Sequence, residues 1–214
     1  MNVLAINGSP RKGWNTATLL GKALEGAASQ GAETELLHLY DLDFKGCRSC
    51  FACKMKDGKS YGRCATKDGL TPVLEKVEEA DALILGSPIY YASVSGEMRS
   101  FMERILFSNM TYTDPPQSLF PRKINTGFIY TMNATEEMMQ QLGWEKHLGF
   151  NRFSLKMIFG HSESLFCFDT YQFKDYSQVV ADRFNPDDKA RQRQEVFPLD
   201  CEKAFDMGAR FAKA

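Results

Sequence analysis

The chain has 214 residues, of which 43% are apolar, and its 26 Lys and Arg nearly balance its 27 Asp and Glu. This size suits one domain with one sizeable core, and the near-neutral charge gives no basis for a nucleic-acid partner. No apolar stretch reaches the roughly 18 residues that a membrane span needs. No cationic region precedes the first apolar run, which is therefore read as a strand rather than a signal peptide. We expect a cytoplasmic protein without membrane contact.

Short apolar runs that end in polar or glycine-bearing turns predict five strands. They cover residues 2–7, 34–39, 81–87, 125–132 and 164–170. Amphipathic patterns predict four helices, at residues 16–29, 70–79 (with Asp68 as N-cap), 93–108 and 200–213. Apolar strands that alternate with helices are typical of a parallel sheet covered on both faces. We therefore expect a three-layer, doubly wound α/β fold with a five-stranded parallel sheet.

Residues 171–198 interrupt this alternation with a segment in which polar and aromatic residues are mixed. It is either a surface loop with a helical turn or an arm that embraces a second subunit, and we favour the arm. The whole chain, 1–214, is expected to be a single domain with this extended excursion.

The sequence GSPRKGWNT follows the first strand and leads into the first predicted helix. Ligands of an open parallel sheet sit beyond the carboxyl ends of its strands, and a helix N-terminus offers free N–H groups to a phosphate. Ser9, Asn15 and Thr16 add polar groups, and Arg11 adds a planar fork of donors. The alternative is an ordinary turn with Asn15 as the helix cap. Neither the nucleoside-triphosphate loop nor the G-x-G-x-x-G dinucleotide motif is present.

A second stretch, GSPIYYASVSGEMRSFMER at residues 86–104, repeats the order of strand, Gly-Ser-Pro, loop and helix. It predicts a second turn at the same edge of the sheet. Residues 88–91 would form a stiff segment that lines a flat ring, although Tyr90 and Tyr91 would serve equally as core or interface aromatics.

Together the two motifs resemble the NAD(P)H-dependent FMN reductases of the flavodoxin-like superfamily, over residues 1 to about 132. The resemblance implies the strand order 2-1-3-4-5 and an FMN cofactor. It implies that the phosphate is bound by Ser9, Arg11, Asn15 and Thr16, and that the flavin is faced by Pro88, Ile89, Tyr90 and Tyr91. A third family loop puts three further residues near the ring or ribityl chain: Thr131, Met132 and Asn133. Here "TMNAT" replaces the glycine-rich version of that loop.

Four of the six cysteines lie close together, at Cys47, Cys50, Cys53 and Cys64. Such a set can hold a cubane iron-sulfur cluster or a tetrahedral zinc. It resembles the cluster-binding run of the iron-sulfur flavoproteins, a branch of the same superfamily, although its last spacing is longer. The alternatives are free thiols beside the flavin or a reversible disulfide. Cys167 and Cys201 are expected to be small buried hydrophobes.

The resemblance therefore implies an FMN-dependent oxidoreductase that transfers hydride or electrons from NAD(P)H to a small oxidised acceptor: a quinone, a nitro or azo compound, or free flavin. No side chain is expected to be catalytic, because the flavin carries the chemistry. One alternative is an iron-sulfur flavoprotein electron carrier, with a 4Fe-4S cluster on the four cysteines and a ferredoxin-like partner. Another is a zinc- or thiol-based interaction module without flavin. A flavin at the strand ends is partly exposed, so we expect a homodimer or higher homo-oligomer.

Overall fold

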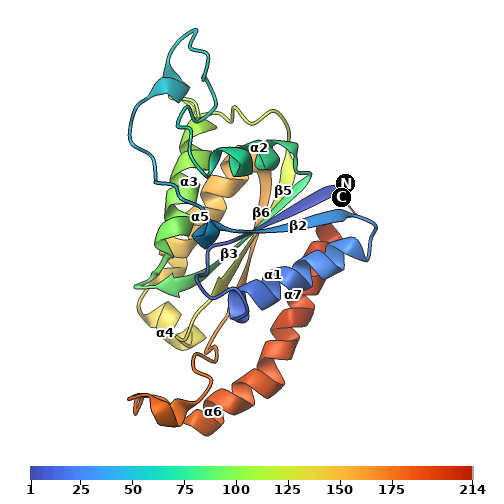
Figure 1. Ribbon diagram of the computed structural model, residues 1–214, viewed down its shortest axis with the longest axis vertical. Coiled ribbons are helices and arrows are strands. Elements are labelled where there is room, and N and C mark those ends of the chain that lie inside the picture. The colour runs from blue at the N-terminus through green and yellow to red at the C-terminus, as the bar shows by residue number, and fades with distance from the viewer. Residues whose placement is uncertain (214) are drawn as a thin grey trace.

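The computed structural model describes residues 1–213 and has an α/β fold in three layers (Figure 1). Its strands are β1 (Asn2–Asn7), β2 (Glu33–His38), β3 (Ala82–Tyr90), β4 (Ser93–Val94), β5 (Ile124–Thr131) and β6 (Gly160–Cys167). Its α-helices are α1 (Asn15–Ala28), α2 (Thr71–Glu79), α3 (Gly96–Ser108), α4 (Glu136–Gln141), α5 (Trp144–Phe159), α6 (Pro186–Arg191) and α7 (Phe197–Phe211). Short 3-10 helices cover Leu39–Asp41, Ala52–Lys54 and Tyr176–Gln178, and a π-helical turn, Gln192–Val196, joins α6 to α7.

Five parallel strands form the sheet in the order β2-β1-β3-β5-β6, and the short β4 pairs antiparallel with the end of β3. With β4 set aside, this is the order 2-1-3-4-5, so the expected fold is confirmed. Asn7 at the end of β1 lies opposite His38 of β2 and Gly86 of β3. The turns that follow these strands therefore share one edge of the sheet.

The two faces of the sheet pack against different helices, as Figure 1 shows: α1 and α7 cover one face, and α2, α3 and α5 cover the other. Ile84 of β3 belongs to the apolar cluster that contains Leu20 of α1 and Met207 of α7. Its neighbour Leu83 belongs to the cluster that contains Phe101 of α3. Successive strand residues point to opposite faces, so a sheet covered on both sides needs the continuous apolar runs seen in the sequence.

Several predicted boundaries differ from the structure, and three of the differences have a local cause. The third helix starts at Gly96 instead of residue 93, since Ser93 and Val94 pair with β3 as β4. The N-cap of α2 is Leu70, not Asp68, whose carboxylate instead accepts from the Leu70 amide (3.0 Å). The last strand occupies 160–167 rather than 164–170, because the chain passes directly from α5 into β6 at Gly160.

Helices α4 and α5 are not predicted by the sequence pattern. In α5, Leu155 and Phe159 are buried, while Phe150 and Phe153 on other sides of the same helix are exposed. Aromatic residues on several sides blur the 3.6-residue period on which the prediction relies.

The predicted excursion, residues 171–198, is a loop up to Asn185 and then α6, the π-helical turn and the start of α7. Figure 1 shows these helices continuing past the edge of the sheet. The side chain of Asn185 caps α6 by accepting from the Asp187 amide (2.9 Å). Buried Lys189 ties the segment to the body through Asp169 and Asn133. Its role as an arm that reaches a second subunit stays a prediction.

Over residues 1–213, no helix combines the length and the apolar character that crossing a bilayer requires.

Candidate functional site

Three turns meet at the carboxyl edge of the sheet, after β1, β3 and β5. The Gly8 amide donates to the Gly86 carbonyl (2.8 Å), and the Ser95 hydroxyl donates to the Gly8 carbonyl (2.5 Å). The hydroxyls of Thr16 and Thr131, both buried, are 2.7 Å apart. These bonds join the first turn to the second and to the third, so the structure brings the sequence-predicted loops together.

The N-terminus of α1 has no side-chain cap. Trp14 occupies the N-cap position without a capping hydrogen bond, and the first turn carries no acidic residue. Its amide N–H groups are therefore free to bind an anion, with the helix dipole in support. The ordinary turn capped by Asn15 is wrong, because Asn15 is the first helical residue.

Ser9 and Arg11 lie in the turn that leads to this helix end. Ser9 is buried, and its hydroxyl accepts from the Arg11 amide (3.2 Å). The Arg11 guanidinium stacks 3.5 Å above the Trp14 ring, and its Nη1 donates to the Gln172 carbonyl (2.7 Å). A held guanidinium, a hydroxyl and uncapped amides are a donor set that fits a phosphate group such as that of FMN.

A second cation, missed by the sequence analysis, stands at the same helix end. The Nη1 of Arg193 donates to the side-chain Oδ1 of Asn15 (3.1 Å), and the side-chain Nδ2 of Asn15 donates to the Tyr171 carbonyl (2.9 Å). Asn15 and Arg193 are 178 residues apart, so no local pattern could have paired them. The segment after β6 is thus bound to the first turn.

Tyr90 and Tyr91 form an exposed rim on the second turn. The backbone is left-handed at Tyr91 (φ 49°) and Ala92 (φ 63°), which turns the chain back into β4. Tyr90 is 47% exposed and Tyr91 is fully exposed, so the core alternative is wrong for both. Pro88 and Ile89 are half-buried behind them.

Tyr40, in the 3-10 turn after β2, is an aromatic residue of this region that the sequence analysis missed. Burial, together with the Glu97 carboxylate beside it, raises the pKa of Tyr40, and Tyr90 is also near. The phenol therefore keeps its proton, which it donates to Glu97.

The third turn is bound tightly to the chain after β6. The Met132 amide donates to the Cys167 carbonyl (3.0 Å), and the Thr170 amide donates to the Met132 carbonyl (2.9 Å). The Met132 side chain is buried in the core, and Asn133 bonds to Lys189. Of the three residues predicted here, Thr131 hydrogen-bonds through its side chain to Thr16 at the start of α1.

The four clustered cysteines lie in residues 45–68, which we name the cysteine loop. All four line one cavity of about 20 Å³, together with Arg104 and Phe107 of α3. None of the six cysteines of the chain forms a disulfide. Cys53 is buried, which raises its pKa, whereas the Ala52 amide lowers the pKa of exposed Cys50.

This donor set fits a thiolate-bound metal centre in kind. Within residues 1–213, however, no three Cys, His, Asp or Glu side chains converge closely enough to hold a metal ion. The cavity has room for about one water molecule. Cys47 and Cys50 are exposed, so a metal centre here requires these two side chains to turn inward. Outside the loop, Cys167 is buried as expected, while Cys201 is only half-buried.

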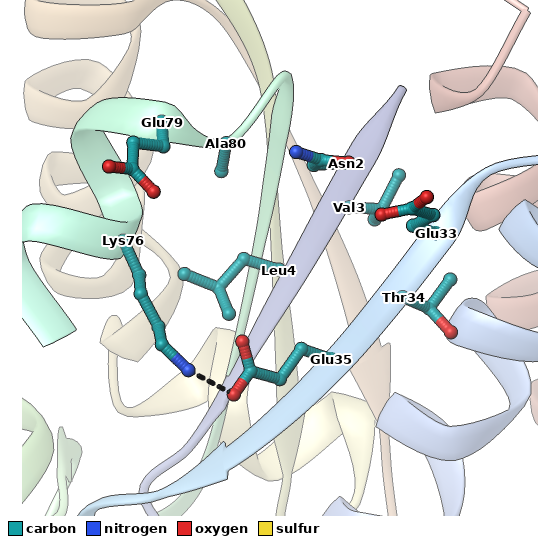
Figure 2. Close-up of a pocket in the computed structure, with 9 residues that line it drawn as sticks. All are labelled: Asn2, Val3, Leu4, Glu33, Thr34, Glu35, Lys76, Glu79 and Ala80. Carbon is teal, nitrogen blue, oxygen red and sulfur yellow. Dashed lines mark hydrogen bonds and ion pairs between the residues drawn. The ribbon is translucent and has the colours of Figure 1, made fainter.

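A cavity of about 380 Å³ lies at the opposite edge of the sheet, between the amino ends of β1 and β2 and helix α2 (Figure 2). Its charged lining is Glu33, Glu35, Glu79 and Lys76, and Lys76 is paired with Glu35. An excess of carboxylates repels a phosphate, so this cavity is unsuited to a nucleotide.

A model of the NADPH-dependent FMN reductase family matches residues 1–144. An iron-sulfur flavoprotein of Methanocaldococcus jannaschii is 39% identical over 104 residues, which are 49% of this chain and 51% of that protein. One from Archaeoglobus fulgidus is 40% identical over 110 residues, 51% of each. The chain thus spans about half the length of the curated relatives it matches.

Solved structures resemble the whole described chain. An NAD(P)H:quinone oxidoreductase from Methanothermobacter marburgensis has a TM-score of 0.68 at 13% identity, with 98% of each chain covered. An azoreductase from Bacillus anthracis has a TM-score of 0.69 at 12% identity, with 99% of this chain and 100% of that one covered. At such low identity the likeness shows the fold alone.

Proposed function

The chain belongs to the NADPH-dependent FMN reductase family, and on that basis we propose that it is an FMN-dependent oxidoreductase. It transfers hydride or electrons from NAD(P)H to a small oxidised acceptor. The observation that carries the proposal is the uncapped N-terminus of α1, with Ser9 and Arg11 in the turn beside it.

The residues of this edge bind and shield the cofactor. Ser9, Arg11 and the first amides of α1 hold the phosphate, and Asn15 and Thr16 brace the helix end. Pro88, Ile89, Tyr90 and Tyr91 border the ring on the side of the second turn. Thr131, Met132 and Asn133 border it on the third turn through their backbone, because the Met132 side chain is buried and the Asn133 side chain bonds to Lys189. When bound, FMN supplies the redox chemistry by taking hydride from NAD(P)H and passing electrons to the acceptor.

The proposed acceptor is a quinone, a nitro or azo compound, or free flavin. Support comes from the structural relatives, one named as a quinone oxidoreductase and one as an azoreductase. The exposed rim at Tyr90 and Tyr91 leaves a small planar molecule free access.

The phosphate site is tested by comparing FMN with riboflavin, which lacks the phosphate. We expect FMN to bind the apoprotein more tightly and NADPH to bleach the bound flavin anaerobically. Arg11→Ala should weaken FMN binding about 10- to 150-fold, the value of a charge-assisted contact of about 1.5–3 kcal/mol. Riboflavin binding should change little. Fluorescence titration measures both affinities.

Lys12→Ala is the matched control for that substitution. Lys12 is the neighbouring cation, but its Nζ pairs with Asp41 (2.5 Å) in the 3-10 turn after β2. Its FMN affinity should stay near that of the wild type. Equal binding of FMN and riboflavin by the wild type, or no binding of either, contradicts the proposal.

A second candidate function is that of an iron-sulfur flavoprotein electron carrier with a ferredoxin-like partner. It is favoured by the single cavity that all four clustered cysteines line, and by the curated relatives named as iron-sulfur flavoproteins. A 4Fe-4S cluster would be held by Cys47, Cys50, Cys53 and Cys64. Anaerobic purification followed by iron and sulfide analysis separates the two candidates.

We also propose a homodimer or higher homo-oligomer in the cytoplasm. The exposed Phe150 and Phe153 of α5 form a surface that a second subunit would cover. Six cysteines without a disulfide suit a reducing compartment.

A further inference from the structure

Arg104 of α3 is a fully buried cation at the centre of the cysteine loop. Its side chain is 1% exposed. Its Nε donates to the Sγ of Cys64 (3.0 Å), and its Nη1 donates to the carbonyl of Lys45 (3.0 Å) and to Asp68 Oδ2 (2.7 Å). Its Nη2 donates to the carbonyl of Thr66 (3.1 Å) and to Asp68 Oδ1 (3.2 Å). The five N–H donors of the guanidinium are therefore all used.

These partners lie at both ends of the cysteine loop. Lys45 precedes the first cysteine, and Cys64, Thr66 and Asp68 come at the end of the loop. Burying a cation is costly unless it is paired and fully hydrogen-bonded, and an apolar side chain would fill the same space without that cost. Arginine has the donors to bind several acceptors at once. Arg104 uses them to hold the two ends of the cysteine loop together.

The same side of α3 holds the rest of the loop. Glu103 accepts a hydrogen bond from the Cys47 amide (3.2 Å). Lys54, between Cys53 and Cys64, donates to carbonyls at the end of α3, including that of Ser108 (3.2 Å), and stacks over the Phe107 ring. Figure 1 shows the loop, blue to cyan, projecting past α3. Two cations, Arg48 and Arg104, thus line the cavity together with the thiols, and Lys54 bonds the loop to the end of α3.

We propose that Arg104 is the positioning residue of the cysteine loop: it joins the two ends of the loop at Lys45 and Asp68, and it hydrogen-bonds the Cys64 sulfur when that sulfur binds a metal. The proposal rests on the second candidate function. Four thiolates carry net negative charge, which a buried guanidinium offsets. Hydrogen bonds to ligand sulfurs and nearby charge also set the reduction potential of a cluster.

The test uses two probes on the full-length protein under anaerobic conditions: Co²⁺ alone, and iron with sulfide. We expect the wild type to bind Co²⁺ with thiolate-to-cobalt charge-transfer bands. Arg104→Met should weaken Co²⁺ binding about tenfold or more, the usual cost of losing a partner of a metal ligand, and should reduce the iron and sulfide retained. Arg122→Met is the control, because Arg122 is an exposed arginine that donates to the Ala80 carbonyl away from the loop.

Arg104→Lys keeps a cation facing Asp68 but loses the planar set of guanidinium donors. It is the variant to measure if Arg104→Met fails to fold. Its reconstituted cluster should have a lower reduction potential than that of the wild type, a change that a purely structural role would not produce. The proposal is overturned if the Arg104 variants bind Co²⁺ as tightly as the wild type and their clusters have the same reduction potential. A wild type that binds neither probe also overturns it, and FMN binding by that same sample shows whether the flavin proposal still stands.

Discussion

The carboxylate of Asp68 is held ionised by the groups around it. Burial alone would raise the pKa of Asp68, but hydrogen bonds from Arg104 and from the Leu70 amide outweigh burial and lower it. The folded-state pKa therefore lies below the unfolded value of about 4. The ion pair stabilises the fold fully above that pH, and the stabilisation is lost as the pH falls through the folded pKa.

Asp68→Asn should remove this dependence. At pH 7 we expect its free energy of unfolding to be about 1–3 kcal/mol below that of the wild type, because a charged hydrogen-bond partner of Arg104 is lost. The difference should shrink as the pH falls below about 4. Urea unfolding at a series of pH values measures it. A difference that stays constant from neutral to acid pH would show that the ionised carboxylate is not what stabilises the loop.

Single residues were predictable where the chemistry is local. Ser9, Arg11 and Thr16 follow one strand within a short motif, and the structure brings their turn to the expected edge. Arg104 was not predictable as a partner of the cysteines, because Cys64 lies 40 residues before it and Lys45 lies 59 residues before it. In the sequence it looks like any charged residue of an amphipathic helix.

At the scale of elements, α1 and α7 pack with their backbones almost touching. A Cβ on Gly208 of α7 would lie 1.7 Å from the Ala23 carbonyl oxygen of α1, and a Cβ on Gly26 would lie 1.9 Å from the Phe205 carbonyl oxygen. Neither clash involves a flexible side chain, so only a shift of one helix could relieve it. The pair holds the start of α1, and with it the anion site, in place.

Gly208→Ala should therefore lower the free energy of unfolding by about 3 kcal/mol, the upper range for overpacking. Gly21→Ala, in the middle of α1, is the control: nothing lies within 4 Å of the added Cβ. It should raise the free energy by about 0.5–1 kcal/mol, because alanine favours a helix over glycine. Chemical unfolding of both variants checks the pair, and equal effects at the two sites would refute the close helix contact.

Helices and strands were predictable where the pattern of buried residues is regular along the sequence. The parallel strands read as apolar runs because both faces are covered, and α1 and α7 each bury one stripe. The hairpin of β3 and β4 was missed because its turn uses Tyr91 and Ala92 at positive φ, where glycine or asparagine would be the usual signal.

For the whole molecule, the proposed cofactor edge is built from both ends of the chain. The first turn is bonded to Gly86, Thr131 and Gln172, residues that belong to or follow three other strands. A ligand that binds there interacts with the folded chain and not with the unfolded one, so it should stabilise the entire fold.

We expect FMN at one hundred times its Kd to raise the free energy of unfolding by about 2.7 kcal/mol. For a chain of this size that corresponds to a rise in Tm of about 5–11 °C. Riboflavin at the same concentration should produce a much smaller rise. Thermal unfolding followed by circular dichroism gives both values. If FMN and riboflavin raise the Tm equally, the phosphate does not contribute to binding.

The contact between Asn15 and Arg193 has a consequence for folding during translation. During translation, α1 leaves the ribosome long before Arg193, which lies 178 residues later, has been synthesised. Until α7 emerges, the part of the first helix that packs against α7 has no cover, and the nascent chain exposes an apolar surface that promotes aggregation. Completion of the proposed cofactor edge is thus one of the last events in the biogenesis of this protein.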